Sequence, residues 1–145
     1  MARLNRLFLV AAVLSGYGCG LLEPPVPETA RVVIEGEAGS RVRLITATNF
    51  LAAVVPETSV THIVVIQSDT TLATLPFQQE YAIRRDQQFF VQASRLDADL
   101  PDLHMSVFID SDREFDETGP LRDGIFYRFV YMFNRRLTPD LEVEL

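Results

Sequence analysis

The sequence predicts an all-β fold, an immunoglobulin-like or transthyretin-like two-sheet sandwich of about seven antiparallel strands. Apolar residues recur with a period of two from Ala30 onward, and no long stretch has the 3.6-residue period of an amphipathic helix. Turn residues interrupt the chain about every 8 to 12 residues, a spacing typical of β-sandwiches. Hydrophobic residues make up 48% of the 145 residues, enough apolar surface for the core of one domain.

The first half of the domain divides into five segments bounded by turn or strand-breaking residues: residues 31–36, 41–48, 49–55, 60–67 and 70–75. The first, second and fourth segments are predicted strands. The third segment is ambiguous, because Ala52 and Ala53 would also tolerate a helical turn before Pro56. The fourth is an almost continuous run of β-branched residues, which predicts a strand buried on both faces. A break is expected at Pro76.

The second half supplies further candidate strands: residues 79–85, 88–95, 103–109 and 125–133, with residues 141–145 as a last edge strand or a frayed tail. The first two flank a tight turn at Asp86-Gln87 and form the best candidate hairpin of the chain. Acidic loops are expected at residues 96–102 and 110–124, on either side of the third strand.

The strand at residues 125–133 is the most aromatic segment. One parity carries Ile125, Tyr127, Phe129, Tyr131 and Phe133. We expect this parity in the core, because alternate residues of a strand face the same side. The opposite parity is also apolar apart from Arg128, which leaves two interpretations. Either the strand is central and covered on both faces, or it presents an exposed apolar patch to a partner.

Residues 1–18 have the features of an export signal. Arg3 and Arg6 give a positive n-region, residues 7–14 form an apolar run, and residues 15–18 are mostly small. The apolar run is too short to span a bilayer, which needs about 20 apolar residues. The sequence therefore predicts a signal peptide that is removed or processed.

The residues that precede Cys19 resemble the lipobox of bacterial lipoproteins, in which the Cys is acylated. Gly18 fits the pattern, whereas Tyr17 and Gly16 stand where a smaller residue and Leu are usual, and ordinary signal cleavage at the same bond is the alternative. Cys19 is the only Cys, so without lipid an exported chain would carry a reactive thiol in an oxidising compartment. We therefore expect lipid attachment at Cys19. Gly20, by resemblance to proteobacterial lipoproteins, favours the outer membrane and the periplasm.

Residues 19–29 are predicted to be a lipidated, Pro-rich tether, followed by the β-sandwich domain at residues 30–145. Pro24, Pro25 and Pro27 exclude a helix or a central strand in the tether. The chain has 13 Arg and no Lys against 20 acidic residues, a net charge of −7. This charge disfavours contact with anionic headgroups and with nucleic acid, whose phosphates require clustered cations.

Short motifs along the domain resemble one known family: Leu75-Pro76-Phe77, the strands at residues 80–85 and 89–93, Ser106-Val107-Phe108-Ile109-Asp110, and the strand from Gly124. Their order resembles that of the MmpS-type proteins, small accessory proteins of mycobacterial lipid exporters, over residues 32–131. The family has Trp where this chain has Phe77, a transmembrane helix in place of the lipoprotein-like signal, and a pair of Cys that this domain lacks. The resemblance implies a β-sandwich at the cell surface or in the periplasm that serves membrane transport or envelope assembly.

Residue spacing suggests two possible chemical sites. Asp110, Asp112 and Asp116 have a spacing with which a loop could wrap around Ca²⁺, although the loop lacks the Gly and the bidentate Glu of an EF-hand. A solvated acidic loop that resists aggregation is the alternative, and no metal is assigned. His104 lies beside Ser106 in the sequence, but no Gly-x-Ser-x-Gly elbow is present, so no catalytic residue and no cofactor is predicted.

These features together predict a non-enzymatic, lipid-anchored protein of the bacterial cell envelope. It would act as an accessory or interaction module of a membrane transport or envelope complex. Its partners would be the membrane, through its acyl chains, and another envelope protein. The alternative is a module that binds a carbohydrate or a calcium-dependent surface.

Overall fold

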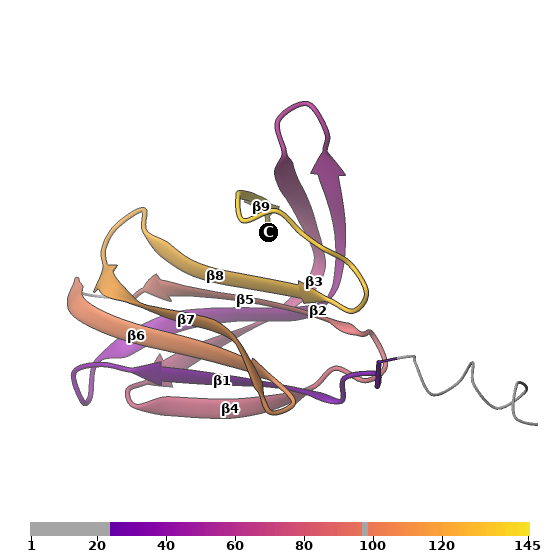
Figure 1. Cartoon of the computed structure of the whole chain (residues 1–145). Coiled ribbons are helices and arrows are strands. Elements are labelled where there is room, and N and C mark those ends of the chain that lie inside the picture. Colours follow the sequence, from indigo (N-terminus) through magenta and orange to yellow (C-terminus); the bar gives the residue numbers. More distant parts are fainter. Residues whose placement is uncertain (1–23, 97–98) are drawn as a thin grey trace, which may run out of the picture.

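The computed structural model describes residues 24–96 and 99–145, and these residues form a two-sheet β-sandwich (Figure 1). The predicted fold class is confirmed, with nine strands over the described residues. The strands are β1 (Thr29–Glu35), β2 (Arg41–Val55), β3 (Val60–Thr74), β4 (Phe77–Ala82), β5 (Gln88–Arg95), β6 (Leu100–Ile109), β7 (Asp112–Leu121), β8 (Phe126–Met132) and β9 (Leu141–Glu144).

The strands divide into a four-stranded sheet, in the order β4-β1-β6-β7, and a five-stranded sheet, in the order β8-β5-β2-β3-β9. Neighbouring strands are antiparallel except β3 and β9, which are parallel. β7 and β8 are edge strands of different sheets, and they lie along the same side of the sandwich (Figure 1). Phe115 of β7 and Phe129 of β8 meet there, with ring centroids 5.8 Å apart.

The main core lies between the two sheets, because the pleat of each strand directs every second side chain inward. In β1, Ala30, Val32 and Ile34 are fully buried, while the residues between them are partly exposed. Facing strands add β-branched and aromatic side chains at the same spacing. Removing this apolar surface from water is the main stabilising contribution to the fold.

β5 is the strand that is buried on both faces. Phe89 points into the main core, where its ring lies 5.2 Å from that of Tyr81, and Phe90 points to the opposite face of the sheet. There Phe90 meets Phe50, with ring centroids 6.4 Å apart. The prediction that residues 60–67 would be buried on both faces is wrong, because that part of β3 has Val64 and Ile66 exposed to solvent.

β2 and β3 form one long hairpin whose outer part bends over the five-stranded sheet (Figure 1). Register shifts between Thr46 and Phe50 mark the bend, and bulges of this kind increase twist and curvature. The ambiguous segment at residues 49–55 is therefore strand, continuous with residues 41–48. We call the outer part of the hairpin, residues 50–65, the upper hairpin. Its residues Phe50 and Ile63 cover Phe90 and so build a second, smaller core.

The bend and the C-terminus are held by specific hydrogen bonds. The Gln88 side-chain amide donates to the carbonyl oxygens of Thr48 and Phe50, at 2.9 and 3.1 Å. The Thr61 hydroxyl accepts a hydrogen bond from the Thr138 backbone amide at 3.0 Å, which docks the segment before β9 onto β3. The last segment is therefore an edge strand, one of the two predicted alternatives.

The hairpin predicted around Asp86-Gln87 is wrong. β4 pairs with β1 in the four-stranded sheet, whereas β5 pairs with β2 and β8 in the five-stranded sheet. The exposed turn between them therefore connects the two sheets and does not join paired neighbours. Alternating apolar residues and a short turn are compatible with a hairpin and with a connection between two sheets. Only the pairing partners of the two strands distinguish these arrangements.

The acidic loop predicted at residues 110–124 is also wrong for most of its length. Residues 112–121 form β7, which pairs with β6 and contributes Leu121 to the core. The acidic side chains are compatible with a strand because β7 is an edge, where charges discourage pairing with other chains.

The predicted signal peptide, Cys19 and the first part of the tether lie outside the described residues, as does part of the first acidic loop. In the described parts of the chain, no helix could cross a bilayer.

Leu103→Ala should lower the free energy of unfolding by about 2–5 kcal/mol, because it opens a cavity around a fully buried side chain in the main core. Urea unfolding of the full chain measures this loss. Leu51→Ala is the matched control, since Leu51 is 64% exposed and should change stability by less than about 0.5 kcal/mol. Equal losses in the two variants would contradict the assignment of the core.

Candidate functional site

A network of charged and polar side chains crosses the outer face of the four-stranded sheet. His104 of β6 lies between two carboxylates: its Nδ1 is 3.1 Å from Glu35 of β1, and its Nε2 is 2.7 Å from Asp116 of β7. The Ser106 hydroxyl donates to Asp116 at 2.8 Å and lies 3.3 Å from His104 Nε2. Arg113 also donates to Asp116, at 2.9 Å.

The structure thus brings together His104 and Ser106, but not as a nucleophile and its base. A Ser-His pair needs an unprotonated ring nitrogen that accepts the serine proton. Here both ring nitrogens face carboxylate oxygens, which accept hydrogen bonds and favour the doubly protonated ring. Hydrogen bonds that His104 donates to Asp116 and Glu35 raise the pKa of His104, and the bonds that Asp116 accepts from His104 and Ser106 lower the pKa of Asp116 to about 2. The network is a cross-strand ion pair that joins three strands.

The three aspartates considered for Ca²⁺ have separate surroundings. Asp110 accepts hydrogen bonds from the backbone amides of Glu28 and Thr29, at 3.0 and 2.9 Å, and these bonds lower its pKa. Asp116 belongs to the His104 network, and Asp112 is an exposed residue at the start of β7. Over the two described ranges, no three His, Cys, Asp or Glu side chains are grouped as a metal site.

The aromatic strand is β8. One of the two predicted alternatives placed it in the centre of a sheet, and this alternative is wrong. Tyr127, Phe129 and Tyr131 contact the main core, as expected for their parity. Val130 and Met132, of the other parity, contact the second core. β8 is nevertheless an edge strand, because β5 is its only neighbour among the described strands.

The backbone of β8 is therefore free along one side. The Phe133 amide donates to the carbonyl oxygen of Gln87, so the odd-numbered residues of β8 direct their amide and carbonyl groups toward β5. By alternation, the backbone groups of Phe126, Arg128 and Val130 point away from the sheet. Within the described residues, no backbone–backbone hydrogen bond is made by these outward groups.

A groove of about 400 Å³ lies beside this free edge, between β7, β8 and the segment that leads to β9. We call it the β8 groove. Its apolar lining consists of Phe115, Phe129, Val130, Leu137, Pro139 and Leu141. Apolar walls with a few polar groups are typical of binding surfaces.

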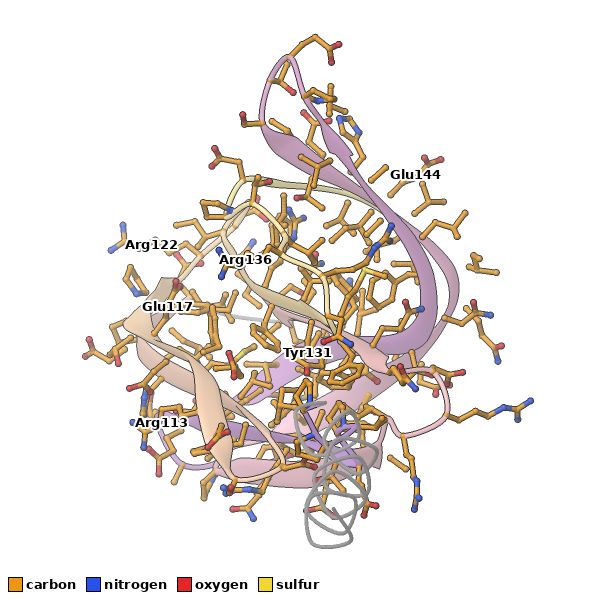
Figure 2. All side chains as sticks on the ribbon, turned by 45° about the vertical axis from the view of Figure 1, so that its right-hand side comes forward. Arg113, Glu117, Arg122, Tyr131, Arg136 and Glu144 are labelled. Carbon is orange, nitrogen blue, oxygen red and sulfur yellow. The ribbon has the colours of Figure 1, made fainter. Side chains whose placement is uncertain are left out.

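Three charged residues of the β8 groove have no ion-pair partner among the described residues: Glu114, Glu117 and Arg128. The Arg128 Nε donates to Gln92 at 2.6 Å, and its guanidinium lies 4.7 Å from the ring centre of Phe126. Burial lowers the pKa of Arg128. Figure 2 shows Glu117 along β7, whereas Glu144 lies on the opposite side of the molecule.

The two glutamates lie near the tyrosines of β8. Burial raises the pKa of Tyr127, and the charge of Glu117 adds to this shift. Burial likewise raises the pKa of Tyr131, with a further contribution from the charge of Glu114. The sequence pattern predicts a loop at both glutamates, so it gives no indication that they lie on a strand beside β8. The sequence does indicate Arg128 as a candidate residue of this site, because it is the single Arg in an aromatic strand.

A smaller polar pocket of about 160 Å³ lies where β2 and β3 bend. Its lining consists of Thr46, Ala47, Thr48, Asn49, Gln67, Asp69 and Tyr81. The Tyr81 hydroxyl is buried without a well-formed hydrogen bond to any described residue, and burial raises its pKa.

The His104 network should make stability depend on pH. Because folding raises the pKa of His104 above 6.5, its contribution is complete below pH 6.5 and is lost as the pH rises through the raised value. Urea unfolding between about pH 6 and 9 should therefore show a fall in stability that His104→Gln reduces. His62→Gln, at the histidine whose Nε2 lies 3.1 Å from Glu142, is the control and should keep the part of the fall that depends on His104. An unchanged fall in His104→Gln would contradict the network.

The chain was compared with family models, with curated proteins and with solved structures, and none matches. The β8 groove, the His104 network and the polar pocket must therefore be interpreted from their own chemistry.

Proposed function

We propose that this protein is a non-enzymatic, lipid-anchored module of the bacterial cell envelope that binds another protein through the β8 groove. The observation that carries the proposal is the free edge of an aromatic strand beside an apolar groove. Natural proteins usually blunt such an edge with charges, Pro or a covering segment, because it can pair with another chain. β8 has one charged residue and no Pro, so its edge is suited to binding.

A binding role is favoured over catalysis by the state of His104, the histidine that lies next to the Ser106 hydroxyl. His104 is bound through both nitrogens to carboxylates and lies on an exposed sheet face. A general base must be within reach of a substrate proton and able to accept it, and neither condition is supported for a ring held in this way.

The anchor and the location are proposed from the sequence. The lipobox-like residues before Cys19 and the absence of any second Cys favour lipidation. Acyl chains at Cys19 and the Pro-rich tether would hold the sandwich away from the bilayer, and the resemblance of Gly20 to the corresponding residue of outer-membrane lipoproteins favours the periplasmic face of that membrane. The MmpS-like motifs favour an accessory role in membrane transport or envelope assembly.

A second candidate is a module that binds a small polar ligand such as a sugar. It is favoured by the polar pocket at the bend, whose Thr, Asn, Gln and Asp side chains could exchange hydrogen bonds with hydroxyl groups. The two candidates place the ligand at different positions, one beside Tyr81 and the other beside Arg128, so protection of backbone amides on binding distinguishes them.

Lipidation at Cys19 should be visible in the intact mass of the protein extracted from membranes. The expected mass is that of a chain beginning at Cys19 plus its acyl groups, because the proposed modification follows cleavage before this residue. The Cys19→Ser variant should lack the acyl mass and should not be retained by the membrane. A native chain with a free thiol that is released by high salt alone would contradict the anchor.

Binding through β8 should be visible by photocrosslinking in intact cells. Phe126 is 43% exposed at the free edge, and its replacement by benzoylphenylalanine should give one discrete adduct with an envelope protein. Leu72 is 58% exposed on β3 and is the matched control position, from which the same adduct is not expected. Adducts of equal yield from both positions, or none from Phe126, would contradict a binding site at β8.

A further inference from the structure

We propose that the partner binds by strand addition: an extended segment pairs with the free edge of β8 and alternates apolar residues with Lys or Arg. This inference rests on the proposed function and specifies the binding mode and the chemistry of the partner. Main-chain hydrogen bonds would supply affinity, and the side chains that line the groove would supply specificity.

The length of the segment follows from the backbone of β8. The outward groups of Phe126, Arg128 and Val130 can pair with an added strand. Turns bound this stretch at both ends, because the Ile125 amide bonds to the carbonyl oxygen of Arg122 and the Arg135 amide bonds to that of Met132. The free edge therefore accommodates about five residues of a partner strand.

The alternation of apolar and cationic residues in the partner segment follows from the two faces of β8. Partner residues opposite Tyr127 and Phe129 would direct their side chains toward β7, where Phe115 offers an apolar surface and Glu114 and Glu117 offer unpaired carboxylates. Lys and Arg suit this environment, since their aliphatic stems cover apolar surface while their charged ends reach carboxylates.

Partner residues at the alternate positions would meet a different environment. Partner residues opposite Arg128 and Val130 would point to the outer face, toward Leu137, Pro139 and Leu141. This side is apolar except for the Arg128 guanidinium, so apolar partner residues suit it. The two parities together give a segment in which apolar and cationic residues alternate.

A second copy of this chain is not the favoured occupant. Antiparallel pairing of β8 with itself that uses all three outward residues would place Arg128 directly opposite its copy. Like charges opposite each other in a sheet are destabilising. β8 also carries only one cationic residue to meet the carboxylates of β7, and each copy has a net charge of −7.

The test uses the full chain purified in detergent and a fluorescent peptide with the core sequence Val-Lys-Val-Lys-Val. Fluorescence anisotropy should show saturable binding at low salt, and hydrogen exchange should show new protection of the Arg128 and Val130 amides. A peptide with Glu in place of Lys should bind about tenfold or more weakly, because like charges oppose its binding. N-methylation of one alternate set of peptide amides should abolish binding, and methylation of the other set should not.

Substitutions in the protein, in place of changes in the peptide, test the same contacts. The double variant Glu114→Gln/Glu117→Gln should weaken binding of the Lys peptide by about three- to tenfold. Glu57→Gln/Glu144→Gln removes two charges from exposed positions away from the groove and is the matched control. Val130→Pro removes an outward amide that β5 does not use and should abolish binding while the variant stays folded. If this variant fails to fold, the methylated peptides provide the same test.

The inference is overturned if the Glu peptide binds as well as the Lys peptide, if neither set of methylated amides matters, or if the chain forms a stable dimer through β8. Absence of peptide binding together with a discrete crosslink from Phe126 would overturn strand addition alone. Absence of that crosslink would overturn the proposed function itself.

Discussion

Two consecutive phenylalanines on β5 are the constraint on which the rest of the structure depends. The pleat of a strand directs adjacent side chains to opposite faces, so Phe89 and Phe90 cannot share one core. Both are fully buried, which requires apolar cover on both sides of the five-stranded sheet. The four-stranded sheet covers Phe89, and the bent upper hairpin, with the C-terminal segment, covers Phe90.

Covering Phe90 determines the shape of β2 and β3. A flat hairpin would continue the plane of the sheet and leave the outer face of β5 in water. The bulges between Thr46 and Phe50 bend the hairpin so that Phe50 and Ile63 reach this face, and Gln88 stabilises the bend through backbone carbonyls. The polar pocket lies at the same bend, and Thr46, Asn49 and Gln67, which pair on either side of a register shift, line it.

The same arrangement leaves β8 at an edge. β3 and β9 stand at the other end of the five-stranded sheet, and no strand within the described residues continues the sheet beyond β8. On the neighbouring edge, β7 carries the acidic residues that blunt it against pairing. One side of the sandwich therefore combines an apolar free edge with unpaired carboxylates, and the proposed partner chemistry follows from this combination.

The fold class and most of the strands could be predicted from the sequence, because a period of two depends only on which residues are apolar. The sequence also offered Cys19 and the preceding signal-like segment, which are local patterns. It did not determine which strands pair: the segments around Asp86-Gln87 looked like a hairpin and lie in different sheets, since alternation is the same in both arrangements. The edge position of β8, and the position of Glu114 and Glu117 beside it, could not be predicted, because contacts between residues distant in sequence depend on sheet order and register, which no local pattern encodes.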